Sequence, residues 1–223
     1  MFQLPKRLEA VASYVSEGAI VADIGSDHAL LPCFLVLTHR INKAYAGEVI
    51  VGPLQQSKKS IDEYKLSSFI TPILSDGLEN IPEDTTEIVI AGMGAYTILD
   101  ILKAYPNKVK KYNKIIVQAN SHMEEIRKYI SKQHFQIINE TIVYEKEKYY
   151  EICVFIPRNG RDLSENEITY GPIHLKEKSQ GFIDYYQNLI KVKKQILQKI
   201  ENTSSKYKEI EDEIQKIDNV IKS

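Results

Sequence analysis

The stretch Ile20-Val21-Ala22-Asp23-Ile24-Gly25-Ser26-Asp27-His28 decides the fold of this chain. Its first five residues form a short apolar run that is typical of a buried strand, and a turn of small and polar residues follows at once. A helical pattern over residues 29–38 comes next. This order predicts the first unit of a doubly wound α/β sheet, with backbone N–H groups free at the turn to meet a ligand.

The same alternation of strands and helices continues to about residue 157. Further strands are expected over 43–48, 70–74, 87–91 and 115–117, and helices over 53–65, 98–105 and 123–132. Strands separated by helices of this length pair in parallel through crossover helices. Two more strands, over 135–144 and 149–156, predict an antiparallel hairpin that closes the sheet.

The composition changes after the segment Pro157–Arg161, which we interpret as a linker. We expect one domain over residues 1–157 and a helical coiled-coil domain over 158–223. In the second domain, a set of mostly apolar residues recurs at alternating intervals of four and three positions, as in a coiled coil. They are Ile196, Ile200, Thr203, Tyr207, Ile210, Ile214, Ile217 and Ile221. Ser204 or Ser205 is a candidate cap for a second helix. One long helix and an antiparallel hairpin both fit, and we favour the hairpin because its helices bury each other's seam.

The overall composition is that of an ordinary globular protein, with 43% hydrophobic and 26% charged residues. A net charge of −1 neither favours nor excludes nucleic acid. The sequence contains no signal-peptide pattern and no run of about 18 apolar residues, so we expect a cytoplasmic protein without membrane contact. Cys33 and Cys153 match no metal-ligand spacing, and we expect buried, unreactive thiols and no metal.

The turn after the first strand does not fit a dinucleotide. A dinucleotide fingerprint needs Gly-x-Gly-x-x-Gly beneath a pyrophosphate, but only Gly25 is present and Asp27 would repel phosphate. S-adenosylmethionine has no phosphate and carries sulfonium and ammonium cations, which tolerate nearby carboxylates. A seven-stranded, mostly parallel sheet that ends in a hairpin is also typical of class I methyltransferases. We therefore predict a Rossmann-like methyltransferase domain that binds S-adenosylmethionine, with an NAD-dependent dehydrogenase as the weakest alternative.

Three acids follow the first three strands, at the sheet edge where this fold class binds ligands. We expect Asp23 to contact the ammonium group of the cofactor, Glu48 its ribose hydroxyls and Asp76 its adenine amino group. Each acid alone fits a helix cap or a turn former equally well, but the three together favour a cofactor site. The predicted cofactor set is completed by Gly25, Ser26, Val49, Gly77, Ala91, Gly92 and Met93.

Several strings resemble one bacterial family. They are Asp23–Ala29 followed by Leu31-Pro32, then Ala46-Gly47-Glu48 and Ala91-Gly92-Met93-Gly94, with Arg7-Leu8, Gln118 and Asn120. The chain resembles, over nearly its whole length, the tRNA (adenine-22-N1)-methyltransferases of TrmK type. The resemblance implies a coiled-coil C-terminal domain, S-adenosylmethionine as donor and tRNA as substrate. Leu30 replaces an aromatic residue that is common in the family, so we expect no base stacking there; Ala95 and Ala119 replace a glycine and a proline.

Methyl transfer to N1 of adenine needs no base to create the nucleophile, because N1 carries a free lone pair at neutral pH. Catalysis then depends on positioning and on stabilising the cation that develops on the ring. We expect Asp27 to stabilise that cation and His28 to orient the base or relay a proton. Met93 is expected to contact the base, and Asn120 either to hydrogen-bond an adenine edge or to cap the helix that follows.

Eight basic residues against two acids lie between Lys103 and Lys132, a candidate surface for RNA phosphates. We assign to tRNA binding Arg7, Lys108, Lys110, Lys111, Arg127 and Lys128. A solvated helix face explains the same run of charges. The C-terminal helices carry nearly as many acids as lysines, so they either grip tRNA by shape or associate weakly with a second copy.

Two other functions fit parts of the pattern. A small-molecule methyltransferase is disfavoured by the helical appendage and the basic run. A catalytically silent cofactor-binding or RNA-binding scaffold is disfavoured because it would have no reason to keep the full set of acids. The sequence therefore predicts a methyltransferase that modifies adenine N1 in tRNA.

Overall fold

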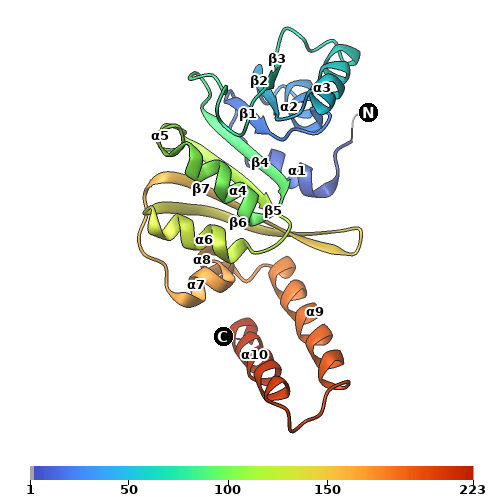
Figure 1. The fold of residues 1–223 in the computed structure, drawn as a ribbon, viewed down its shortest axis with the longest axis vertical. Helices are drawn as coiled ribbons and strands as arrows, with labels where there is room; N and C mark the ends of the chain where they lie inside the picture. Colours follow the sequence, from blue (N-terminus) through green and yellow to red (C-terminus); the bar gives the residue numbers. More distant parts are fainter. Residues whose placement is uncertain (1–2, 223) are drawn as a thin grey trace.

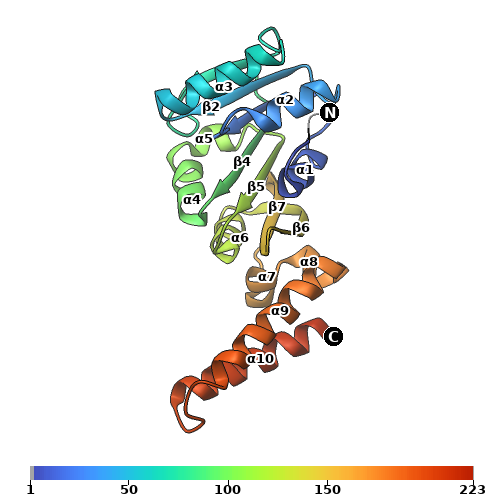
Figure 2. The same ribbon diagram turned by 90° about the vertical axis from the view of Figure 1, so that its right-hand side faces the viewer.

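The computed structural model describes residues 3–222, with a seven-stranded sheet at one end and a pair of long helices at the other (Figures 1 and 2). The strand order is β3-β2-β1-β4-β5-β7-β6. The strands are β1 (Ile20–Ile24), β2 (Lys43–Glu48), β3 (Ile70–Leu74), β4 (Glu87–Met93), β5 (Lys114–Ala119), β6 (Phe135–Glu145) and β7 (Lys148–Asn159). The first five pair in parallel, whereas β7 pairs antiparallel with both β5 and β6. The predicted sheet and its closing hairpin are confirmed.

Helices cover both faces of the sheet (Figure 2). Successive strand residues point to opposite faces, and since both sets are apolar, each face must be buried. Val21 and Val89 pack on the face covered by α1 (Lys6–Ser13), α2 (Leu30–Leu37) and α3 (Val51–Glu63). Ala22 and Ile88 pack on the other face, covered by α4 (Ala95–Ala104), α5 (Pro106–Val109) and α6 (Met123–Lys132). Helices α1 and α5 were not predicted, and α3 and α4 begin two and three residues earlier than expected.

The two free cysteines lie on opposite faces of this sheet, and both are buried as expected. Burial raises the pKa of the Cys33 thiol to about 11 and also raises that of Cys153. No helix of residues 3–222 is long and apolar enough to cross a membrane.

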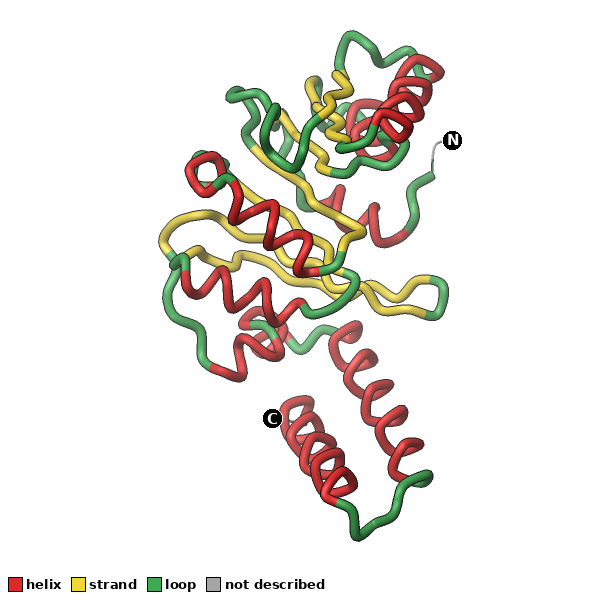
Figure 3. Tube along the Cα trace, viewed as in Figure 1, coloured by secondary structure: helices red, strands yellow, loops and turns green. Residues whose placement is uncertain are grey.

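Four helices follow the sheet: α7 (Glu165–Tyr170), α8 (Pro172–Glu177), α9 (Gln180–Leu197) and α10 (Ser205–Lys222). Helices α9 and α10 form the expected antiparallel hairpin (Figure 3), and the Ser204 hydroxyl accepts the Tyr207 N–H at 3.1 Å, which caps α10. Ile210 and Ile217 are buried in the hairpin seam, but Ile196 is 42% exposed. The expected repeat therefore does not run unbroken through the turn between the helices.

Helices α7 and α8 belong structurally with the sheet, because a buried arginine joins them to it. Arg127 Nε donates to Glu140 Oε1 at 2.7 Å, and Nη2 donates to Glu151 Oε2 at 2.8 Å. Arg127 Nη1 donates to the Thr169 carbonyl at 3.3 Å, while Glu140 Oε2 accepts the Ile173 N–H at 2.9 Å. Burial lowers the pKa of Arg127, but the two carboxylates outweigh this effect and raise it overall.

This arrangement changes two expectations. The assignment of Arg127 to tRNA is wrong for this structure, because its side chain is 1% exposed and its donors are used inside the protein. The boundary at residue 157 also cuts through β7, which continues to Asn159. We propose that the separable C-terminal part begins near Ser179, the residue that caps α9.

Replacing Arg127 by alanine is expected to destabilise the protein by about 3–5 kcal/mol, because Glu140 would be left buried without its cation. The free energy of unfolding is measured by urea denaturation. The neighbouring change Lys128→Ala is the control, since Lys128 forms only an exposed ion pair with Glu125 and should matter little. Equal stability of the two variants would contradict a structural role for the buried arginine.

Candidate active site

The turn after β1 holds three consecutive side-chain-bearing residues in the left-handed region. The φ angles of Asp27, His28 and Ala29 are 41°, 67° and 54°. This conformation costs roughly 1–2 kcal/mol for each residue with a Cβ, so neighbouring structure must hold it. The Gly47 carbonyl accepts the N–H groups of Gly25 at 2.9 Å and Ser26 at 3.2 Å.

The third anchor of this turn is a side chain. Glu48 Oε1, at the end of β2, accepts the Asp27 N–H at 2.7 Å and the Ser57 hydroxyl at 3.3 Å. The turn projects the Asp27 and His28 side chains outward, 89% and 52% exposed, with His28 Nε2 3.6 Å from Asp27 Oδ1. Both predicted catalytic side chains are therefore accessible to a ligand at the edge of the sheet.

Asp23, at the end of β1, is almost completely buried and has little compensation for its charge. Among the described residues, only the Ser26 hydroxyl donates to its carboxylate, at 2.6 Å. Burial raises the pKa of Asp23 to about 7, against the lowering effect of that hydrogen bond, and the nearby carboxylates of Glu48 and Asp27 raise it further. Burial also raises the pKa of Glu48. A buried acid with this little support is a candidate partner for a cationic ligand.

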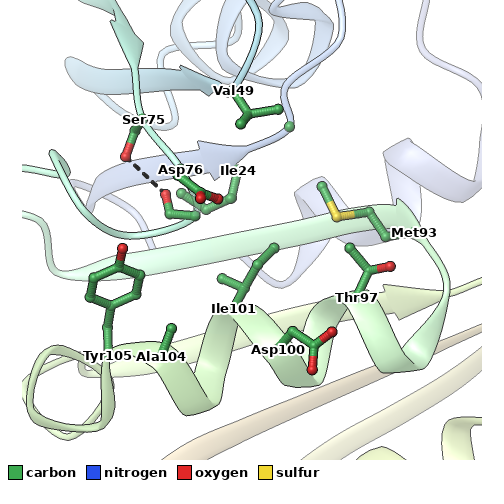
Figure 4. Close-up of a pocket in the computed structure, with 12 residues that line it drawn as sticks. Ile24, Val49, Ser75, Asp76, Met93, Thr97, Asp100, Ile101, Ala104 and Tyr105 are labelled. Atoms are coloured by element: carbon green, nitrogen blue, oxygen red, sulfur yellow. Dashed lines mark hydrogen bonds between the residues drawn. The ribbon is translucent and has the colours of Figure 1, made fainter.

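A cavity of about 350 Å³ opens beside this turn (Figure 4). Its lining includes five residues of the predicted site: Gly25, Val49, Asp76, Gly77 and Met93. A Cβ at position 25 would overlap the methyl group of Met93, so glycine brings the backbone against this side chain. The cavity lies outside the carboxyl ends of β1 and β4, where the strand order reverses, the usual place for a ligand in an open α/β sheet.

The other predicted cofactor residues lie outside the cavity lining. Asp23 and Ser26 are buried behind the turn, and Glu48 is buried beneath it. Ala91 and Gly92 precede Met93 in β4 and do not line the cavity either. Among residues 3–222, no group of His, Cys, Asp or Glu side chains could hold a metal ion.

One wall of the cavity was not predicted. It consists of one face of α4 and the residue that follows it: Thr97, Asp100, Ile101, Ala104 and Tyr105. These residues recur every three or four positions, as expected for one face of a helix. The opposite face of α4 has the same spacing and packs into the core through Ile98, Leu99 and Leu102. Periodicity alone does not distinguish a ligand-facing stripe from a solvated one.

Asn120 lies at the end of β5, next to the loop that contains Met93. Its N–H donates to the Met93 carbonyl at 2.8 Å, and Nδ2 donates to the Gly92 carbonyl at 2.7 Å. The alternative that Asn120 caps the following helix is wrong, because the N-cap position of α6 is His122.

The residues assigned to tRNA differ in their availability. Lys108 Nζ donates to the carbonyls of Leu78, Glu79 and Ile81, so its ammonium group is used inside the protein. Arg7 contacts Gln118 and Glu145 and lies over the ring of Tyr150. The exposed lysines Lys111 and Lys128 pair with acids, whereas Lys110 has no side-chain partner among residues 3–222. The predicted phosphate surface is therefore reduced to a few exposed lysines.

Comparison with known proteins places this geometry in one family. The model of the TrmK family, tRNA (adenine(22)-N(1))-methyltransferase, matches residues 21–219. The tRNA (adenine(22)-N(1))-methyltransferase of Bacillus subtilis is 35% identical, over 98% of this chain and 97% of the relative. The chain belongs to this family.

Solved structures of similar proteins agree with the fold. A Streptococcus pneumoniae protein in complex with S-adenosyl-L-methionine has a TM-score of 0.89 and 36% identity. The match includes 98% of this chain and 100% of the S. pneumoniae chain. The TrmK of Mycoplasma capricolum in complex with S-adenosyl-homocysteine has a TM-score of 0.85 and 32% identity, with 98% of each chain covered. The TrmK architecture therefore extends through the C-terminal helices of this chain.

The raised pKa of Asp23 predicts a pH-dependent stability. A folded-state pKa near 7, above the unfolded value of 3.8, adds stability below about pH 4 that is lost as the pH rises through 7. We expect Asp23→Asn to increase the free energy of unfolding of the ligand-free protein at pH 8 by up to roughly 4 kcal/mol, since one pKa unit is about 1.4 kcal/mol. The measurement is the melting temperature, which should rise.

The effect of Asp23→Asn should shrink toward pH 5, where the carboxyl group of the wild type is protonated. Glu17→Gln is the matched control, because Glu17 is exposed and precedes β1, whereas Asp27 itself raises the pKa of Asp23. Equal melting curves for Asp23→Asn and wild type at pH 8 would contradict a strained buried charge.

Proposed function

We propose that this chain transfers a methyl group from S-adenosylmethionine to N1 of adenine 22 in tRNA. The observation that carries the proposal is its likeness, over 98% of its length, to the B. subtilis enzyme named for that reaction. The cavity lined by Asp76, the buried acids Asp23 and Glu48 behind it, and the exposed Asp27 support it. A silent scaffold or a small-molecule methyltransferase does not account for this likeness.

The residues beside the cavity fit S-adenosylmethionine. Asp23 presents a carboxylate that only the Ser26 hydroxyl supports, which suits the ammonium group of the cofactor. Only Oε1 of Glu48 accepts hydrogen bonds from residues 3–222, so its second oxygen suits a ribose hydroxyl. The exposed Asp76 carboxylate and the apolar Val49 side chain line the cavity and suit an adenine ring. When bound, the cofactor supplies an activated methyl group on sulfur.

The protein's own part in the reaction is positioning and electrostatics. The adenine ring becomes positively charged as the N1–carbon bond forms and the carbon–sulfur bond breaks. The Asp27 carboxylate, held outward by the strained turn, is placed to stabilise that charge. His28 lies beside it and is placed to orient the base, while Met93 separates the cofactor cavity from the acceptor side.

The α9–α10 hairpin supports a monomer that holds tRNA with two separate surfaces. Phe182 and Tyr186 of α9 and Ile210 and Ile217 of α10 fill the apolar seam within one chain. No second subunit is required to cover it. We infer that the hairpin extends the tRNA-binding surface away from the sheet, together with exposed lysines such as Lys110, and that the enzyme works in the cytoplasm with its substrate.

The proposed activity is tested by transfer of labelled methyl groups to unmodified tRNA transcripts, followed by mapping of the modified base. We expect 1-methyladenine at position 22, and no product when guanine replaces that adenine. Asp27→Asn should lower kcat at least about tenfold, because the developing cation loses its carboxylate. Glu17→Gln, an exposed acid at the opposite edge of the sheet, should have wild-type activity. Methylation at another position would contradict the proposal.

The assignment of Asp23 to the ammonium group predicts a pH-dependent cofactor affinity. Because the carboxylate is the binding form and the pKa of Asp23 is about 7, affinity should rise between pH 5.5 and 7.5 with release of a proton. Titration calorimetry in buffers of different ionisation enthalpy measures both effects. Asp23→Asn should bind more weakly and release no proton. Unchanged proton release in that variant would remove Asp23 from the assignment.

A further inference from the structure

Gln118, near the end of β5, is completely buried, and its partners determine which way its amide faces. Its Oε1 accepts from Arg7 Nη1 at 3.3 Å and from the Gly92 N–H at 3.0 Å. A guanidinium and a backbone N–H can only donate, so the amide oxygen must face them. The Gln118 NH₂ group is therefore directed to Asn120, where it donates to Oδ1 at 3.2 Å.

The orientation of the Asn120 amide is fixed in the same way. Its oxygen accepts from Gln118, and its Nδ2 donates to the Gly92 carbonyl, which can only accept. A flipped Asn120 amide would place oxygen against oxygen at Gly92 and NH₂ against NH₂ at Gln118. Its backbone is held as well, through the N–H donated to Met93. The chain Arg7–Gln118–Asn120 therefore keeps one amide orientation.

Two hydrogen-bonding groups of the Asn120 amide are left for a ligand. An amide has two N–H donors and an oxygen with two lone pairs, and the network uses one of each. Asn120 is exposed, and its neighbour Met93 lines the cofactor cavity. Among residues 3–222 no other group takes the remaining N–H and oxygen lone pair, so Asn120 has one donor and one acceptor available at the edge of the site.

This pair complements one edge of adenine. Adenine presents the N6 amino donor beside the N7 acceptor, and an asparagine amide pairs with both at once. N1 lies on the other side of N6 and remains open to the methyl donor. Guanine has an oxygen acceptor in place of the N6 donor, which would meet the Asn120 oxygen. Guanine O6 and N7 are both acceptors, so either orientation of the amide would set its oxygen against one of them. A fixed amide already has the orientation that pairs with adenine, whereas a flipped amide would set its oxygen against N7 and its NH₂ group against N6.

We propose that Asn120 reads the N6/N7 edge of the target adenine, and that Arg7 and Gln118 are positioning residues that hold its amide in the reading orientation. This inference rests on the proposed function, since it concerns the base that is methylated. It assigns Arg7 to the network and not to an RNA phosphate, in keeping with its contacts to Gln118, Glu145 and Tyr150.

The test replaces one atom of the substrate. Transcripts carrying 7-deazaadenine at position 22 lack the N7 acceptor but keep N1 and the N6 amino group. For the wild type we expect kcat/KM to fall about tenfold or more with this tRNA, in line with the value of a bidentate base contact. Asn120→Ala should lower activity on normal tRNA and be insensitive to the 7-deaza change. Melting curves of both tRNAs check that the substitution leaves their folding unchanged.

The positioning role is tested with Asn120 intact. Gln118→Glu keeps the acceptor for Arg7 and Gly92 but loses the donor to Asn120, and Gln118→Met keeps the packing without hydrogen bonds. Arg7→Ala removes the donor that orients Gln118. All three should lose the sensitivity to 7-deazaadenine, while the cofactor affinity stays near wild type. Arg7→Lys should keep part of the sensitivity to 7-deazaadenine.

Arg40→Ala is the control for Arg7, because Arg40 holds the other end of α1 through the carbonyls of Val15 and Ser13. It should lower the melting temperature and keep the discrimination. A wild type that methylates both tRNAs equally would overturn the role of Asn120. Variants of Gln118 and Arg7 that still discriminate would overturn the positioning role. A wild type inactive on both tRNAs would instead contradict the proposed function.

Discussion

The hydrogen bond from the Asp27 backbone to the Glu48 carboxylate is the interaction on which the site depends. Three successive left-handed residues do not persist unless their surroundings hold them. Within residues 3–222, Glu48 is the one side chain that accepts the Asp27 N–H. It does so from the neighbouring parallel strand, in register with β1. One oxygen of this carboxylate holds the turn, and the ribose contact that we propose for Glu48 would use the other. The donor and acceptor sides of the enzyme are linked through this side chain.

Two buried acids of this protein, Glu140 and Asp23, differ in how far their charge is compensated. Glu140 forms a buried ion pair with Arg127 and accepts a backbone N–H, so its charge is compensated within the protein. Asp23 is buried just as deeply but receives a single hydroxyl. The first arrangement holds elements together, and the second leaves an electrostatic deficit that a cationic ligand can fill. Burial without compensation is the physical difference between Asp23, the proposed cofactor ligand, and the structural acid Glu140.

Local patterns predicted the sheet well, because each strand is a short apolar run between turn signals. All seven strands and the helical hairpin follow from such patterns. Helices α7 and α8 were missed because they are one or two turns long and are held by contacts with distant residues such as Arg127. Lys108 and Arg127 were misread for a similar reason: sequence counts charges, but only the fold shows which charges already have partners.

The same limit applies to the site. Asp23, Glu48 and Asp76 were selected because acids at the ends of parallel strands meet at one edge, and Asp76 lines the cavity there. The α4 wall of the cavity was not found, since a ligand-facing stripe has the ordinary helical interval. Gln118 and Asn120 were noticed only through family resemblance, and their connection to Arg7 spans more than a hundred residues. No local pattern contains that connection.

The buried arginine also has a consequence for the order in which the chain can fold. Arg127, Glu140 and Glu151 leave the ribosome before Thr169 and Ile173, which satisfy the remaining groups of this cluster. The strands up to β5 can assemble early, but the outer β6–β7 edge is complete only when α7 and α8 have been synthesised. The α9–α10 hairpin follows these helices in the chain and then packs against residues that have already been synthesised. The residues that line the cavity are therefore synthesised before the α9–α10 hairpin.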